Sequence, residues 1–388
     1  MVDLFKPRIH HDRLHPSFKH IIESPRLAPV MPVIQGWGQG LLDRNGERDK
    51  FINEFQSTFN SAMWELYINR VILDLGFTID FTKNSPDFCV TTKEGYRFNI
   101  EAVISDANHQ KPKYKFTTHE KFKNEGALKL IGKLNDKINI FRGDEGKKFP
   151  YSAMEHVAGV PFVIAIAPFD NDMSLMQNNE LINLVLFGIG APAMHSKKGW
   201  DRAAGIRKIY KDSGADVEVG IFTNPSFKQI SAVIFSTTGT FGKAVIESGI
   251  DQMVRSTRYR TIDKSNSDSR GPLWSLGVSR SYIGNAGHIL RERSDFCDKI
   301  CGSDMLICPS SMHRETHLDG LHIYYNPYAD HPLDNNIFKT GKVTHNSYDV
   351  ESSMEIMDHP DGALVSRDVY DRNCPMLRRI IRSYGFFA

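Results

Sequence analysis

The chain has 388 residues, of which 40% are hydrophobic and 24% charged, as in a globular protein with one large domain or two ordinary ones. Its formal net charge of +2 excludes a uniformly basic nucleic-acid-binding protein. It contains no apolar run of about 18 residues that would cross a membrane, and its first residues lack the apolar segment of a signal peptide. Five cysteines, an odd number, favour a reducing compartment over a disulfide framework, so we expect a cytoplasmic protein.

Charge is spread unevenly along the chain. Residues 111–148 contain eleven Lys or Arg against five Asp or Glu, and residues 255–293 contain eight against three. Residues 319–371 contain ten acidic residues against three basic ones. Two basic segments and an acidic one could form a groove that faces phosphate groups, with a solvated surface behind it. Solvated loops and helix faces explain the same pattern, and composition leaves both interpretations open.

The first elements in chain order are an arm and a helix. Residues 1–45 contain five prolines and little periodicity, so we expect an extended arm that lies on the main domain. From Phe51 to Leu75 a large apolar residue recurs at every fourth position, which predicts one long helix that ends at Gly76. The second half of this helix is apolar almost all round, and one narrow polar stripe remains: Thr58, Ser61, Glu65 and Asn69.

An alternation of strands and helices follows. Strands are predicted at residues 77–81, 87–92, 96–105, 160–169 and 229–237, and helices at residues 126–141 and 179–190. The order helix, three strands, helix, strand, helix, strand predicts an α/β sandwich with a mixed central sheet. We assign residues 46–245 to this domain. Beyond it the pattern loosens, and we expect residues 246–388 to pack on the core, with substrate binding as one role.

Two carboxylates stand out in this pattern. Asp87 opens the strand "DFCVTT", and Glu101 interrupts the apolar strand "FNIEAVIS". The turn "KEG" between the strands suits a hairpin, which would bring the two carboxylates to one end of the sheet. Hard oxygen ligands fixed on strands suit a divalent metal that hydrolyses phosphodiesters. Glu65 on the preceding helix would supply a third carboxylate or hold a metal-bound water.

Each acid also has a plain structural interpretation. Asp87 follows a proline and suits a turn, and Glu65 suits the exposed face of a helix. Glu101 is harder to explain in this way, because a sheet covered on both sides would bury its carboxylate, which then needs a partner. Taken together, the ordered set predicts a metal site.

The order of Glu65, "SPDF" and "FNIEAVIS" resembles the PD-(D/E)xK nuclease superfamily, whose core is α-β-β-β-α-β. More narrowly, "EFQSTFNSAMWELYI", "ISAVIFSTTGT" and "HIYYNPYADHPL" resemble a little-characterised group of bacterial proteins. The resemblance implies a restriction-endonuclease-like fold and a Mg²⁺- or Mn²⁺-dependent nuclease, in the first instance a DNA endonuclease. It also implies a role in bacterial defence, with DNA, partner proteins of a defence system or a second copy of the chain as partners.

Carried over to this chain, the resemblance makes Asp87 the motif aspartate, Glu101 the second acid and Glu65 the helix glutamate. Val103 occupies the position of the motif lysine, which positions the attacking water and offsets charge on the phosphorane. We expect Lys133 from the following helix to replace it, with Lys137 as the second candidate. Either residue could instead be a lysine whose stem covers an amphipathic helix. In that case the protein is a catalytically degenerate module that binds nucleic acid or a partner.

Two other clusters are weaker candidates. Three cysteines and two histidines could bind a structural Zn²⁺, although their spacing matches no common zinc finger: Cys297, Cys301, Cys308, His313 and His317. A buried strand that holds Cys308 is the alternative. The segment "RSTRYRTIDKSNSDSR" is a candidate contact with the nucleic-acid backbone, or else a surface loop, through Arg255, Arg258, Tyr259 and Arg260.

Overall fold

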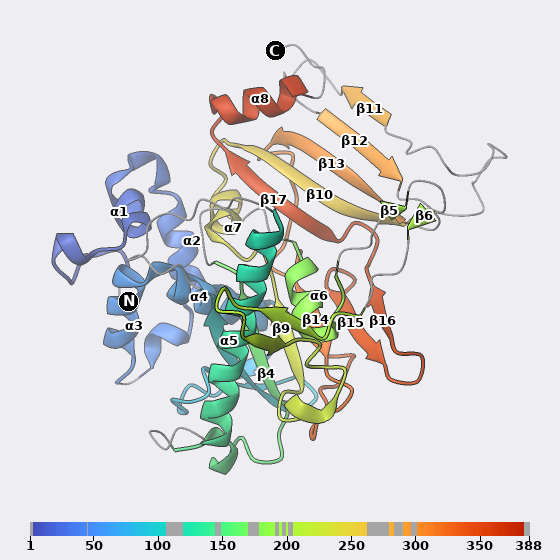
Figure 1. Cartoon of the computed structure of the whole chain (residues 1–388). Helices are drawn as coiled ribbons and strands as arrows, with labels where there is room; N and C mark the ends of the chain where they lie inside the picture. The colour runs from blue at the N-terminus through green and yellow to red at the C-terminus, as the bar shows by residue number, and fades with distance from the viewer. Residues whose placement is uncertain are drawn as a thin grey trace.

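A computed structural model describes residues 3–44, 46–105, 119–143, 149–169, 178–190, 194–195, 199–200, 205–261, 279–282, 290–295 and 301–383 (Figure 1). Its helices are η1 (His11–Arg13), α1 (Pro16–Glu23), η2 (Pro25–Leu27), α2 (Val30–Trp37), η3 (Leu41–Asp43), α3 (Arg48–Ser57), α4 (Phe59–Asp74), α5 (His119–Arg142), η4 (Tyr151–Ala153), α6 (Glu180–Phe187), η6 (Pro225–Phe227), α7 (Phe241–Glu247) and α8 (Pro375–Ser383). Its strands are β1 (Thr78–Ile79), β2 (Phe88–Thr91), β3 (Arg97–Ile104), β4 (Phe162–Ala167), β5 (Met194–His195), β6 (Gly199–Trp200), β7 (Lys208–Tyr210), β8 (Asp216–Glu218), β9 (Ala232–Phe235), β10 (Met253–Thr261), β11 (Ser279–Tyr282), β12 (Leu290–Asp295), β13 (Cys301–Pro309), β14 (His322–Tyr325), β15 (Thr344–Asp349), β16 (Met354–Asp358) and β17 (Leu364–Tyr370). No helix among the described residues is long and apolar enough to cross a membrane.

The larger sheet has the strand order β1-β2-β3-β4-β9-β14-β15-β16. β2 pairs with β1 and β3 in antiparallel fashion, whereas β3, β4 and β9 run parallel to one another. The expected mixed sheet flanked by helices is therefore confirmed. Because β3, β4 and β9 are parallel, the chain must cross over the sheet between them, and α5 and α6 lie in these crossovers.

Both faces of this sheet are covered. On one face, side chains of α1–α4 such as Phe55 and Trp64 form a single cluster with alternate residues of β3, and the Trp64 indole donates to Ala165 O at 3.0 Å. On the other face, α5 and α6 pack on Ile164 and Ile166 of β4. All six residues of β4 are buried, which explains why this strand is an uninterrupted apolar run in the sequence.

The long helix predicted over residues 51–75 is two helices. α3 ends at Ser57 and α4 begins at Phe59, with Thr58 between them at φ −122° and ψ 34°. The Ser57 and Thr58 hydroxyls donate to the carbonyls of Asn53 and Glu54, at 2.7 and 3.0 Å. Such bonds compete with the backbone hydrogen bonds of the helix and explain the break. The apolar spacing of the sequence continues across the break and so does not reveal it.

The expectation of an extended N-terminal arm is also corrected. The described part of this segment forms two short α-helices and three 3₁₀ helices that bury apolar side chains against α3 and α4. Pro16 and Pro25 are the first residues of α1 and η2, where the missing N–H costs nothing. Two of the five prolines that suggested extended chain therefore begin helices.

The chain after residue 245 contributes to both large sheets. β14, β15 and β16 extend the first sheet, because β14 pairs with β9. The remaining strands form a five-stranded sheet with the order β11-β12-β13-β10-β17, which lies beside α8 at the top of Figure 1. The loosened pattern predicted for this region is therefore corrected, because its described residues contain regular strands.

A buried charge cluster lies between the two sheets. Lys243 of α7, Glu315 and Arg367 of β17 have side chains that are only 2–3% exposed. Glu315 Oε1 lies 3.8 Å from Lys243 Nζ and 3.3 Å from Arg367 Nε, and its other oxygen faces His313 Nε2 at 3.2 Å. The Lys243 ammonium also donates to Thr316 O and Asp319 O. Charges buried this deeply must be paired, and here they connect α7 with β17 of the second sheet and with the loop before β14.

Candidate active site

The predicted hairpin of β2 and β3 is confirmed, and it brings Asp87 and Glu101 together. The register pairs Phe88 with Ile100, so continuing it by one residue sets Asp87 opposite Glu101. Asp87 Oδ2 accepts a hydrogen bond of 2.8 Å from the Ala102 N–H. Residues opposite each other in an antiparallel pair present their side chains on the same face. The two carboxylates therefore share one end of the hairpin.

Glu101 is 3% exposed and lies on the face that α5 covers. Its Oε1 atom accepts a hydrogen bond of 2.7 Å from the Lys137 ammonium and a longer one of 3.4 Å from the Tyr151 hydroxyl. Its Oε2 atom is also buried and has no hydrogen-bond partner. A buried carboxylate oxygen without a partner is costly, and it is the kind of atom that a metal ion or a bound water satisfies.

Of the two candidate lysines, Lys137 reaches the acids. It lies on α5, one turn after Lys133, and its side chain is 20% exposed. Val103 is partly buried against the cluster that α5 forms with the sheet, two residues after Glu101 and on the same face. Among the described residues no polar contact joins Lys133 to Glu101 or Asp87. Of the two predicted lysines, it is therefore Lys137 that places a cation beside Glu101.

Glu65 lies on α4, is half-buried, and interacts electrostatically with both other acids. Burial raises the pKa of Glu65 well above its ordinary value, and the charges of Asp87 and Glu101 raise it further. Burial and the Asp87 charge also raise the pKa of Glu101, to about 7, against the opposing effect of Lys137. Burial raises the pKa of Asp87 as well, again opposed by Lys137. Three acids that are costly to ionise together would be stabilised in their charged forms by a cation.

Lys137 itself stays charged in this site. Burial alone would lower the pKa of Lys137, but the carboxylates of Glu101 and Asp87 outweigh that effect and raise it. The ammonium therefore remains a donor at neutral pH. It can hold a water or offset negative charge, but it is not a base.

Sequence reasoning missed two residues of this site. Tyr151 of η4 is buried beside Glu101, and no motif marks it. Arg44 follows η3 and is 8% exposed, and its guanidinium acts electrostatically on Glu65 and Asp87. Arg44 precedes the first predicted helix in a segment without periodicity, so only the folded chain shows that it belongs here.

The residues present fit a metal held by few protein ligands. Asp87 and Glu101 offer carboxylate oxygens at one end of the hairpin. One of these atoms, Glu101 Oε2, is buried without a hydrogen-bond partner. Within the part of the chain that the structure describes, no group of three or more His, Cys, Asp and Glu side chains is arranged to hold a metal ion. A cation at this place would therefore take Asp87 and Glu101 as direct ligands and keep several waters, as Mg²⁺ does. Glu65 would act through one of these waters.

The described members of the predicted cysteine–histidine cluster each have different neighbours. Cys308 is buried in β13, and His313 faces Glu315. His317 lies between Asp74 at 2.7 Å and Glu247 at 3.0 Å. Cys297 lies outside the described residues, as does the side chain of Cys301. The described members of the predicted zinc site do not gather round a common point.

The arginines proposed to contact nucleic acid lie in β10, a strand and not a loop. Arg258 donates to Asp319 Oδ1, Gly362 O and Arg314 O, at 2.6–2.7 Å. Arg255 faces Asp368 at 3.5 Å, and the Tyr259 ring packs on His359 with 4.7 Å between ring centroids. Arg260 is partly buried in the same strand. Arg258 therefore uses its donors inside the protein, between the second sheet and the loop before β14.

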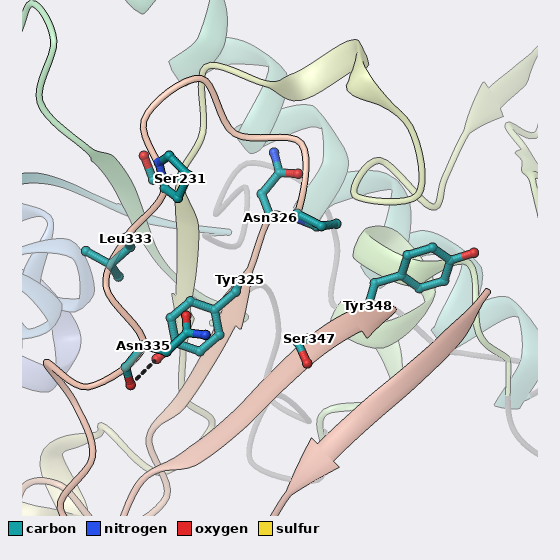
Figure 2. A pocket seen from close by; sticks show the side chains of 9 residues that line it. Ser231, Tyr325, Asn326, Leu333, Asn335, Ser347 and Tyr348 are labelled. Atoms are coloured by element: carbon teal, nitrogen blue, oxygen red, sulfur yellow. Dashed lines mark hydrogen bonds between the residues drawn. The ribbon is translucent and has the colours of Figure 1, made fainter. Parts of the chain in front are cut away.

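A cavity of about 220 Å³ lies apart from the acids, between β9, β14 and β15 (Figure 2). The Ser231 hydroxyl donates to His331 O, and the Asn326 amide donates to Phe227 O and Ile230 O. The Tyr325 hydroxyl donates to Asn335 O at 3.4 Å. These polar groups are satisfied within the chain, so they hold the strand ends together and give a ligand little to bind.

Comparison of the chain with known protein families, with curated proteins and with solved structures finds no match. The geometry of the acids and of Lys137 is therefore the basis for a function.

Proposed function

We propose that the protein is a Mg²⁺- or Mn²⁺-dependent phosphodiesterase that acts on nucleic acid, in the first instance a DNA endonuclease. One observation carries the proposal: Glu101 lies opposite Asp87 with one oxygen paired to Lys137 and the other buried without a partner. The order of α4, β1, β2, β3, α5 and β4 supports it, because it is the α-β-β-β-α-β order of the superfamily that the motifs resemble.

In this proposal Asp87 and Glu101 bind the metal, and Glu65 holds one of its waters. A metal bound by these carboxylates would supply a water of lowered pKa and would offset charge on the phosphate. Lys137 orients the attacking water beside Glu101 and offsets the charge that develops on the phosphate oxygens. The water oxygen forms a bond to phosphorus and releases a proton to solvent, while the bond from phosphorus to the leaving sugar oxygen breaks and that oxygen takes up a proton from solvent.

The test uses supercoiled plasmid and duplex and single-stranded oligonucleotides, with Mg²⁺ and then with Mn²⁺. Asp87→Asn and Glu101→Gln should each abolish a cleavage that the wild type shows. Asp80→Asn is the matched control, because Asp80 is an exposed carboxylate that directly follows β1, the neighbour of β2, and accepts a hydrogen bond from Thr82. Equal cleavage by the wild type and the Asp87→Asn/Glu101→Gln double variant would sink the proposal.

A second function is a nucleic-acid- or partner-binding module that retains the fold without catalysis. Val103 at the position of the motif lysine favours it, as does a ligand set of only two close carboxylates. DNA binding without cleavage, together with no heat of Mg²⁺ or Mn²⁺ binding in calorimetry, would support this function over the first.

A defence role, with its partner proteins or self-association, rests on the resemblance alone. Loss of phage protection in a host that expresses Glu101→Gln would test it.

A further inference from the structure

Arg44 has an unusual environment for an arginine. It is 8% exposed, and its buried Nε atom has no hydrogen-bond partner. Among the described residues no hydrogen bond or ion pair joins its guanidinium to another group. Of the comparable arginines of the second sheet, Arg258 contacts a carboxylate and two backbone carbonyls, and Arg367 contacts a carboxylate and one backbone carbonyl. A buried guanidinium without such contacts has donors left for a ligand.

The segment that carries Arg44 is fixed on α4 beside Glu65. The Asn69 amide of α4 donates to Trp37 O at 2.7 Å and to Gln39 O at 3.0 Å. Gly38 lies so close to the helix that a Cβ atom there would be 3.2 Å from the side chain of Leu66, the neighbour of Glu65. These contacts hold the following turn, η3, and Arg44 at its end. The position of Arg44 is therefore determined by the fold.

The charges around Arg44 indicate what it would bind. Its guanidinium lowers the pKa of Glu65 and of Asp87, against the larger effect of burial. With the three carboxylates ionised, Lys137 and Arg44 leave the site with one negative charge. A divalent cation would turn this into one positive charge, which the single negative charge of a phosphodiester neutralises.

We propose that Arg44 binds the phosphodiester group of the substrate, with its planar fork on two phosphate oxygens, while Lys137 acts on the water side beside Glu101. Arginine suits this role, because its donors match phosphate oxygens two at a time. The inference rests on the proposed function and adds to it a residue that recognises the substrate. Arg44 belongs to the segment before the first core helix, so that segment completes the site.

The test compares Arg44→Gln and Arg44→Lys in the wild-type and Glu101→Gln chains. Binding of a fluorescent duplex is measured with Ca²⁺ at several salt concentrations, and cleavage with Mg²⁺. We expect Arg44→Gln to weaken duplex binding about tenfold or more, as for loss of a charge-assisted contact, and to reduce the salt dependence by about one phosphate contact. Arg44→Lys keeps the charge but not the fork, so it should recover part of the loss. Mn²⁺ affinity, measured by calorimetry, should not fall in Arg44→Gln.

Arg48→Gln is the matched control, because Arg48 is a nearby exposed arginine at the start of α3. The inference would be overturned if Arg44→Gln and Arg48→Gln had the same duplex affinity and the same salt dependence, even if the wild type cleaves DNA. A wild type that binds DNA through Arg44 but does not cleave would support the inference and refute the catalytic function. A wild type that neither binds nor cleaves nucleic acid would overturn both.

Discussion

Glu101 shares one carboxylate oxygen between the Lys137 ammonium and the Tyr151 hydroxyl, while its other oxygen has no partner. At this scale the site contains three acids and two cations whose electrostatic effects oppose each other. Asp87 raises the pKa values of Glu65 and Glu101, and Glu101 raises that of Glu65, while Lys137 lowers the pKa values of Asp87 and Glu101 and Arg44 lowers those of Glu65 and Asp87. A side chain can supply a catalytic charge from any segment, because the reaction depends on its position in space and not on its place in a motif.

Lys137→Met should lower metal-dependent cleavage by about 10²–10⁴-fold, the range for loss of a positioned proton-transfer or charge-stabilising group. Lys133→Met should leave cleavage near the wild-type rate, because Lys133 is a turn away from the acids. Single-turnover rates on one oligonucleotide measure both. Val103 shares a face of β3 with Glu101, so Val103→Lys in the Lys137→Met chain should restore part of the rate. A larger loss in Lys133→Met than in Lys137→Met would contradict the assignment.

Metal binding at this site should depend on pH. The pKa of Glu101 is raised to about 7, so below that pH a cation must displace its proton, and above it the carboxylate is already ionised. One displaced proton would raise the apparent Mn²⁺ affinity by about tenfold between pH 6 and pH 8. Glu65, whose pKa is also raised by burial and by the neighbouring acids, should add to the rise. Calorimetry in two buffers of different ionisation enthalpy counts the protons released, and a pH-independent affinity would count against the site.

At the scale of elements, local pattern predicted the β2–β3 hairpin, α5, and the buried strands β4 and β9, because each is a short periodic or wholly apolar run. It also predicted Asp87 and Glu101, since an acid in a buried strand is conspicuous. It did not predict the break at Thr58, where side-chain hydroxyls compete for backbone carbonyls. Arg44 and the return of β14 to β9 depend on contacts between distant segments, for which a single sequence contains no local signal.

Two glycines test the packing of these elements. A Cβ atom at Gly239, just after β9, would lie 2.5 Å from the Tyr67 ring and 2.8 Å from the Trp64 ring, both buried in α4. Gly239→Ala should therefore cost about 1–3 kcal/mol of unfolding free energy through overpacking. At Gly132, within α5, a Cβ atom would meet nothing within 4 Å. Gly132→Ala should stabilise the protein by about 0.5–1 kcal/mol. Urea titrations measure both, and a Gly239→Ala chain as stable as the wild type would contradict the packing.

At the scale of the whole molecule, the two large sheets are joined by charge as well as by apolar contact. Lys243, Glu315 and Arg367 are buried together at the junction. Burial lowers the pKa of Lys243 to about 8, and the neighbouring Glu315 opposes that shift. Replacing one member of such a cluster leaves the others buried without full compensation, which is more damaging than removing the whole set.

Glu315→Gln should therefore cost about 3–5 kcal/mol of unfolding free energy at pH 7. Burial would raise the pKa of Glu315, but Arg367, Lys243 and His313 outweigh it and lower the pKa far below the ordinary value of 4.5. A lowered pKa means that the stabilisation is complete above pH 4.5 and is lost as the pH falls below it. The difference between variant and wild type should thus shrink at low pH. Lys208→Met, at an exposed pair with Asp216 on the β7–β8 hairpin, is the control that should change little.

The pairing of β14 with β9 has a consequence for the chain during its synthesis. β9 ends at Phe235 and its partner β14 begins at His322, so the ribosome makes the whole of β10 to β13 in between. At ordinary rates of translation that interval is on the order of ten seconds, during which β9 is an open sheet edge. The acids, Lys137, Tyr151 and Arg44 all precede residue 152. The nascent chain therefore contains these residues of the candidate site before it contains β14, β15 and β16, which complete the larger sheet.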